Sequence, residues 1–162
     1  MNSKIIYTIG HGNSELKPIV ELLRKHGIKI LVDVRSTPYS RFAPEFNNRS
    51  LRRSAKTLGI EYKFAGDSLG GRPEDLDCYD GDQVNYDKLA DKDFYKKGIR
   101  RLIEISQEES TAILCSEENP HHCHRHKLIA QTLLQKGFDV LHIRHNGKFE
   151  KAEIELKQQS LF

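Results

Sequence analysis

The sequence has no Trp, a single Met and only three Cys among its 162 residues. Three is an odd number, and the intervals between Cys78, Cys115 and Cys123 are irregular, so no disulfide framework is expected. Long apolar runs are absent, because the run from 28 to 34 is far shorter than the roughly 20 residues of a membrane-spanning helix. The chain starts with a strand-like run instead of a secretory signal. We therefore expect a cytoplasmic protein with no membrane association.

Several functional signatures are also missing. There is no Walker loop, no G-x-G-x-x-G and no G-x-S-x-G, which disfavours NTPases, dinucleotide-binding enzymes and serine hydrolases. The acidic segment does not match a calcium loop, and the seven residues between Cys115 and Cys123 are not a known zinc spacing. No cofactor and no metal ligand is predicted, although a metal ion held by these cysteines and the nearby histidines remains open.

The charge is unevenly distributed along the chain. The net charge is +3, but residues 66–87 hold seven acidic residues and one Arg, so the remainder is about +9. A basic body with an acidic flap could attract a polyanion such as a nucleic acid. An ordinary charged surface would show the same composition.

Short β-rich runs alternate with amphipathic helices. Strands are predicted at 5–9, 28–34, 60–64, 111–115 and 140–143, and helices at 14–26, 48–58, 92–106 and 120–136. Ser14 is the predicted N-cap of the first helix, and Gly27 its stop. This alternation predicts an α/β fold, in a single three-layer domain with a mostly parallel sheet of about five strands. The domain is assigned to residues 1–148, and 149–162 form a C-terminal tail.

Unusual polar residues follow the predicted strands, where ligands bind in parallel sheets. They are His11 and Asn13 after the first strand, Asp33, Arg35, Ser40 and Arg41 after the second, Gly70 and Gly71 after the third, and Glu117, Cys123, His124 and Arg125 after the fourth. Independent segments that converge on one edge predict a site there.

Each candidate has a functional and a structural interpretation. His11 could transfer protons or could cap the following helix. Asp33 could be a base, nucleophile or orienting group, or could form a structural ion pair with Arg35. Glu117 could be a partly buried general acid or base, or a first-turn Glu that serves the helix dipole.

Cys123 falls in the first turn of a predicted helix, beside histidines and Arg125. This environment could make it a reactive thiolate, or it could be a small buried helix residue. Cys115 ends an apolar strand, which favours a place in the core. Arg35, Arg41 and Arg125 would hold phosphates. Asn13, Ser40, Gly70, Gly71 and His124 complete the predicted substrate contacts.

Together these segments resemble the domain-of-unknown-function 488 family. The motifs are Thr8–Asn13, Asp33–Arg35 with Pro38–Arg41, Leu69–Gly71, Leu114–Glu117 and Cys123–Arg125. The usual family signature has Ser at Gly12 and often Ala at Ser116. The resemblance implies an α/β domain with these motifs around one site, and it implies no reaction.

The last residues, 158–162, resemble the peptide with which bacterial replication and repair proteins dock into the sliding clamp. Gln158, Ser160, Leu161 and Phe162 match its pattern, and the two apolar side chains would anchor it in a hydrophobic pocket. Alternatively, they could pack back onto the domain.

The leading prediction is an enzyme acting on DNA or a nucleotide-like phosphorylated substrate, in repair, through glycosidic or phosphodiester cleavage by Asp33 and Glu117. The alternatives are a thiol- or metal-based sensor or redox protein that uses Cys115, Cys123 and the histidines, and a non-catalytic nucleic-acid adaptor.

Overall fold

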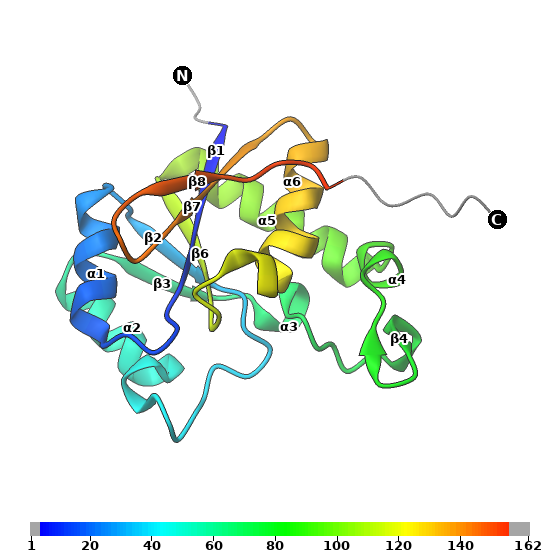
Figure 1. The fold of residues 1–162 in the computed structure, drawn as a ribbon, viewed down its shortest axis with the longest axis horizontal. Helices are drawn as coiled ribbons and strands as arrows, with labels where there is room; N and C mark the ends of the chain where they lie inside the picture. Colours follow the sequence, from blue (N-terminus) through cyan, green and yellow to red (C-terminus); the bar gives the residue numbers. More distant parts are fainter. Residues whose placement is uncertain (1–3, 156–162) are drawn as a thin grey trace.

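The computed structural model describes residues 4–155, which form a six-stranded sheet covered by helices on both faces (Figure 1). The sheet strands are β1 (Ile5–Gly10), β2 (Ile30–Asp33), β3 (Glu61–Phe64), β6 (Thr111–Cys115), β7 (Asp139–Ile143) and β8 (Phe149–Lys151). The α-helices are α1 (Leu16–Lys25), α2 (Asn48–Thr57), α3 (Gly66–Leu69), α4 (Tyr86–Ala90), α5 (Asp93–Glu108) and α6 (Gln131–Gln135).

The strand order is β3-β2-β6-β1-β7-β8, with parallel pairing throughout except between β7 and β8. The predicted α/β class and mostly parallel sheet are therefore confirmed. The sixth strand, β8, lies within the segment 149–162, so the first residues of that segment pair with the sheet.

Two apolar clusters, one on each face of the sheet, create the three layers. Alternate residues of β6 belong to opposite clusters: Leu114 packs with residues of α1 and α2, whereas Ile113 and Cys115 pack with residues of α5. All five residues of β6 are buried, as expected for a central parallel strand. Register then aligns the strand ends, because Gly10 pairs with Cys115 and Asp33 with Leu114.

The first helix begins later than predicted. Glu15 is the N-cap of α1, and the Ser14 hydroxyl donates to the Glu15 carbonyl instead of accepting a helix amide, so Ser14 is not the cap. The predicted stop is confirmed by Gly27, whose φ of 72° is in the left-handed region that favours glycine.

The long connection 66–90 has structure of its own. It contains α3, a 3₁₀ turn (Leu76–Cys78), a small hairpin of β4 (Tyr79–Asp80) and β5 (Gln83–Val84), and α4. Part of its negative charge is balanced locally, because Asp75 pairs with Lys92 and Asp80 with Lys88.

The predicted helix 120–136 is interrupted at Cys123. Asn119 caps a 3₁₀ turn (Pro120–His122), as predicted, but Cys123 then has extended backbone angles. Helical structure resumes at His124 and includes a π-helical segment (Arg125–Ala130) before α6. Cys123 therefore precedes the helix instead of lying in its first turn. No helix within residues 4–155 is long and apolar enough to cross a membrane.

Candidate functional site

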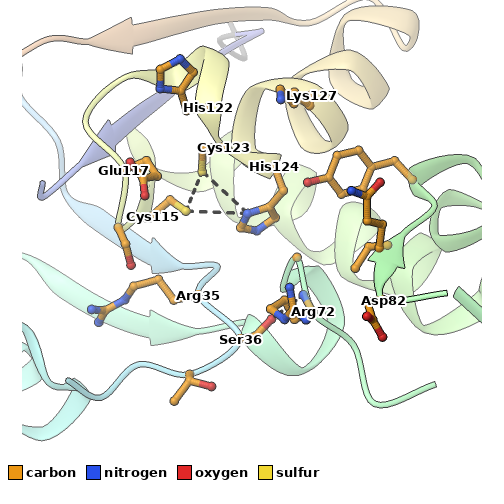
Figure 2. Close-up of a pocket in the computed structure, with 16 residues that line it drawn as sticks. Arg35, Ser36, Arg72, Asp82, Cys115, Glu117, His122, Cys123, His124 and Lys127 are labelled. Atoms are coloured by element: carbon orange, nitrogen blue, oxygen red, sulfur yellow. Dashed lines mark hydrogen bonds between the residues drawn. The ribbon is translucent and has the colours of Figure 1, made fainter. Parts of the chain in front are cut away.

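Two adjoining cavities lie beyond the carboxyl ends of β1, β2 and β6. The thiol pocket, about 700 Å³, contains Cys115, Cys123 and His124 in its lining (Figure 2). The loop pocket, about 660 Å³, is lined by residues 11–15, 39–40, 42–45 and 116–119, with Arg35 and Thr37. The two cavities share Arg35, Thr37, Ser116 and Glu117. This is the edge at which the sequence predicted a site.

Two cysteines face each other in the thiol pocket. Cys115 is the last residue of β6, and Cys123 follows the 3₁₀ turn that closes the next loop. Their sulfur atoms are 2.6 Å apart, and the residues are only 7% and 5% exposed. Both are free thiols, and a small movement would bring them to the roughly 2.05 Å of a disulfide bond.

The two thiols differ in acidity. A hydrogen bond from Cys123, the nearby Arg125 guanidinium and the backbone N–H groups of Ser116 and Glu117 lower the pKa of Cys115 to about 7, against the opposing effect of burial. The same sulfur contact and burial raise the pKa of Cys123 to about 12. Cys115, which the sequence assigned to the core, is therefore the more acidic thiol, instead of Cys123.

His124 is oriented by the backbone. Its Nε2 lies 3.0 Å from the carbonyl oxygens of both Val34 and Leu69, so this nitrogen carries the proton. The unprotonated Nδ1 then faces the two sulfur atoms at 3.7 Å each (Figure 2). His124 is buried in the pocket lining, and both of its ring nitrogens face groups of the protein itself.

Cys115, Cys123 and His124 could together hold a metal ion, because their ligand atoms lie within 4.8 Å of one another. A Cys₂His set with a fixed histidine tautomer suits zinc. Tetrahedral coordination with Zn–S distances of about 2.3 Å would require the sulfur atoms to separate by about 1 Å.

Asp33 and Arg35 form the structural ion pair that was one of the two interpretations. Asp33 is fully buried, accepts bonds of 2.8 and 2.9 Å from the Arg35 guanidinium and one of 3.1 Å from the Arg35 amide, and accepts a fourth from the Tyr62 hydroxyl. It lines neither cavity. Arg35 also donates to the Phe46 carbonyl, and its Nη1 points towards His11 at 3.4 Å. Nη1 is thus the one nitrogen of the Arg35 guanidinium that is not bonded to Asp33 or Phe46, and Arg35 lines both cavities.

His11 lies in the loop pocket, stacked on Phe46 with ring centroids 4.5 Å apart. Its Nδ1 donates to the Gly12 carbonyl, and burial lowers its pKa below the usual histidine range, which favours the neutral ring. Asn13 and Ser40 line the same cavity, whereas Arg41 is exposed beside it.

Arg125 does not face either cavity. It is fully buried and donates to the Thr8 hydroxyl and to the carbonyl oxygens of Glu117 and Glu118. Arg125 therefore holds the loop after β6 in place and has no free edge for a phosphate. Glu117 is exposed on that loop and lines both cavities, so the expected partial burial of its carboxylate is not observed.

Gly70 and Gly71 are both closely packed, and Gly71 also lines the thiol pocket. A Cβ on Gly71 would lie 2.8 Å from the His124 ring, and one on Gly70 would lie 2.3 Å from the Ser36 hydroxyl. Only glycine allows this segment to approach the histidine so closely.

Sequence reasoning assigned no role in the site to several residues that line the thiol pocket. They are Arg72, Asp82, His122 and Lys127 (Figure 2). Lys127 could have been found from its helical spacing of four residues after Cys123, and Arg72 from its place after the third strand. Gln158, Ser160, Leu161 and Phe162 lie outside the described residues.

A family model described as "Domain of unknown function DUF488" matches residues 15–133. The matched range contains both thiols and His124, whereas His11 and Asn13 precede it. No curated protein and no solved structure matches the chain.

Proposed function

The chain belongs to the DUF488 family, and we propose that it is an enzyme that uses the thiolate of Cys115 as a nucleophile on a phosphate-bearing substrate. The single observation that carries this proposal is the contact between two buried thiols of unequal acidity in the lining of an open cavity. A thiolate near neutral pKa is nucleophilic at physiological pH. Cys123 stays protonated and supplies the hydrogen bond that stabilises the thiolate.

The surrounding charges support an anionic substrate. Arg35, Arg72 and Lys127 line the thiol pocket, against the two carboxylates of Asp82 and Glu117. Arginine and lysine side chains bind phosphate groups. Glu117 is positioned between the two cavities, where an exposed carboxylate can accept or deliver a proton as the sequence suggested.

The geometry gives less support to hydrolysis by paired carboxylates. That mechanism needs both Asp33 and Glu117 to face the substrate. Asp33 is fully buried and its oxygens are occupied by Arg35 and Tyr62. Glycosidic or phosphodiester cleavage would therefore have to proceed through Glu117 and the thiol.

A second candidate function is metal binding by the same three side chains. The observation that favours it is the fixed tautomer of His124, whose Nδ1 lone pair faces both sulfur atoms. Metal ligation would make Cys115, Cys123 and His124 a structural or sensing centre instead of a nucleophilic one, because metal-bound thiolates are protected from alkylation.

The test is alkylation of the purified full chain by iodoacetamide across a pH series, with the modified residue identified by mass spectrometry. We expect Cys115 to react first, with a half-maximal rate near pH 7. Cys115→Ser should abolish this fast reaction, and Cys78→Ser should not change it, because Cys78 is fully buried elsewhere.

Metal content is measured on the same sample. Stoichiometric zinc, with both thiols unreactive until a chelator is added, would overturn the nucleophile proposal and support the second candidate. Faster reaction of Cys123 than of Cys115 in metal-free protein would overturn the assignment of the nucleophile.

Docking of residues 158–162 into a bacterial sliding clamp remains part of the proposal. Such docking would bring the enzyme to replicated or repaired DNA in the cytoplasm. Binding of the full chain to the clamp, lost when these five residues are removed, would support it, and equal binding by both forms would contradict it.

A further inference from the structure

Positive charge is concentrated between β2 and β3. Residues 35–56 contain six Arg or Lys and a single acidic residue, Glu45. The rest of the chain contains 20 basic and 22 acidic residues, so this segment accounts for the whole net positive charge. A surface formed by this segment is the part of the molecule best suited to a polyanion.

The charge forms a stripe on α2. Arg49, Arg52, Arg53 and Lys56 are spaced at i, i+3, i+4 and i+7, which places them on one helix face, and all are exposed. The opposite face is anchored in the core by Leu51 and Ala55. None of the four cations forms a salt bridge within residues 4–155.

Exposed aromatic side chains stand at the start of this stripe. Phe42 is 91% exposed and Tyr39 is 68% exposed, and both line the loop pocket. Hydrogen bonds hold their loop in shape: the Ser40 amide donates to the Asn47 side chain, and the Asn48 amide donates to the Pro38 carbonyl. These bonds hold the loop beside the N-terminal end of α2, and the backbone of the loop forms the lower cyan tip of Figure 1.

We propose that residues 37–47 and α2 form a binding surface for single-stranded nucleic acid. Exposed aromatic rings beside a track of cations are the features with which proteins bind single strands, because unpaired bases stack on the rings while the cations follow the phosphates. In a duplex the bases are already stacked, so the rings would have no partner. One base of the strand occupies the loop pocket, stacked on Phe42.

This inference rests on the proposed function in one respect: the strand is the source of the phosphate-bearing substrate. The loop pocket shares Arg35 and Glu117 with the thiol pocket. A nucleotide bound in the loop pocket therefore lies next to the cavity that contains Cys115, and Arg35 can contact its phosphate.

The experiment is fluorescence anisotropy of the full chain with labelled oligothymidine, oligouridine and a labelled duplex, at several salt concentrations. We expect both single strands to bind more tightly than the duplex. Phe42→Ala should weaken strand binding about tenfold, which is within the range found for the loss of one stacked base. The triple variant Arg49→Gln, Arg53→Gln, Lys56→Gln should lower the slope of log K against log salt by about 0.7 for each lost contact.

The matched control removes the same charge from another helix. Lys96→Gln, Lys97→Gln, Arg100→Gln takes away three exposed cations from α5, a helix that itself contains no exposed aromatic side chain. Equal weakening by this control, tighter binding of the duplex, or no binding of either strand at low salt would overturn the inference.

Alkylation of Cys115 and affinity for the strands are measured separately, so failure of the thiol proposal can be distinguished from failure of the binding surface. Cys115→Ser should bind the strands with unchanged affinity while it loses fast alkylation. Phe42→Ala should keep fast alkylation while it loses affinity. Strand binding that is weakened in Phe42→Ala and unchanged in Cys115→Ser supports the surface even where Cys115 proves unreactive in the alkylation test.

Discussion

Two residues of the same type acquire opposite properties at this site. Cys115 is the end of a central strand, where the backbone N–H groups of the following loop and the buried Arg125 favour negative charge. The pKa of Cys123 is raised by the neighbouring Cys115 sulfur, which disfavours a second negative charge beside it. Because a shared proton stabilises the first thiolate, the acidity of Cys115 depends on Cys123 more than on any other group.

Replacing Cys123 should therefore change the pH profile of Cys115. In Cys123→Ala we expect the midpoint of Cys115 alkylation to rise from near 7 towards the ordinary thiol value of about 8.5. Cys123→Ser is the matched control, because its hydroxyl can still donate to Cys115 and should keep a lower midpoint. Identical midpoints in the alanine variant and the unchanged protein would contradict the role of this hydrogen bond.

At the scale of elements, the site depends on how closely α3 and α5 approach. Gly98 of α5 faces α3, and a Cβ there would lie 2.6 Å from the Ser68 hydroxyl and 2.8 Å from a Leu69 methyl group. The Leu69 carbonyl is one of the two acceptors that orient His124. The packing of these helices is therefore linked to the geometry of the thiol pocket.

Gly98→Ala should destabilise the protein by roughly 1–3 kcal/mol, although alanine is the better helix former by about 1 kcal/mol, because the methyl group forces the helices apart. Urea denaturation measures the free energy of unfolding. Lys97→Ala, at the exposed neighbouring position, should stay within about 0.5 kcal/mol of the unchanged protein. A Gly98→Ala variant that is more stable than the unchanged protein would show that α3 can move away from α5 without a loss of stability.

At the scale of the whole molecule, a chain of buried histidines connects distant segments. His142 on β7 contacts Thr8 on β1 and His126 on the π-helical segment, and His126 contacts Glu155 after β8. Burial and the positive charge of Arg125 lower the pKa of His142 to about 3. His142 is therefore neutral in the folded protein at any mildly acidic pH.

This lowered pKa predicts loss of stability in acid. Above about pH 6.5 His142 is neutral in both states, but below it the unfolded chain binds a proton that the folded protein rejects. The stability that the neutral His142 contributes to the folded protein is lost as the pH falls from 6.5 to about 3. The loss amounts to about 2 kcal/mol between pH 7 and 5. Urea unfolding at both pH values tests this. His142→Gln should unfold with a smaller pH difference, and an equal difference would contradict the assignment.

The sequence alone determined the fold class and the edge of the sheet at which the candidate site lies. Thr111–Cys115 was predicted as a strand with the bounds that the structure shows, because a short apolar run between polar turns is typical of a buried strand. Parallel pairing then brings the ends of β1, β2 and β6 together. Helix starts such as that of α1, and the antiparallel β8, were not predicted, because they depend on single hydrogen bonds and on contacts with distant strands.

Only the tertiary structure decided which residues of that edge can do chemistry. Asp33 and Arg125 carry the charges expected of a site, yet both are buried and their polar atoms are occupied within the protein. The sequence assigned Cys115 to the core. In the structure, the helix is interrupted at Cys123, whose sulfur contacts that of Cys115 and lowers the pKa of Cys115. Burial and pKa depend on contacts between residues far apart in the chain, and local sequence patterns contain no record of those contacts.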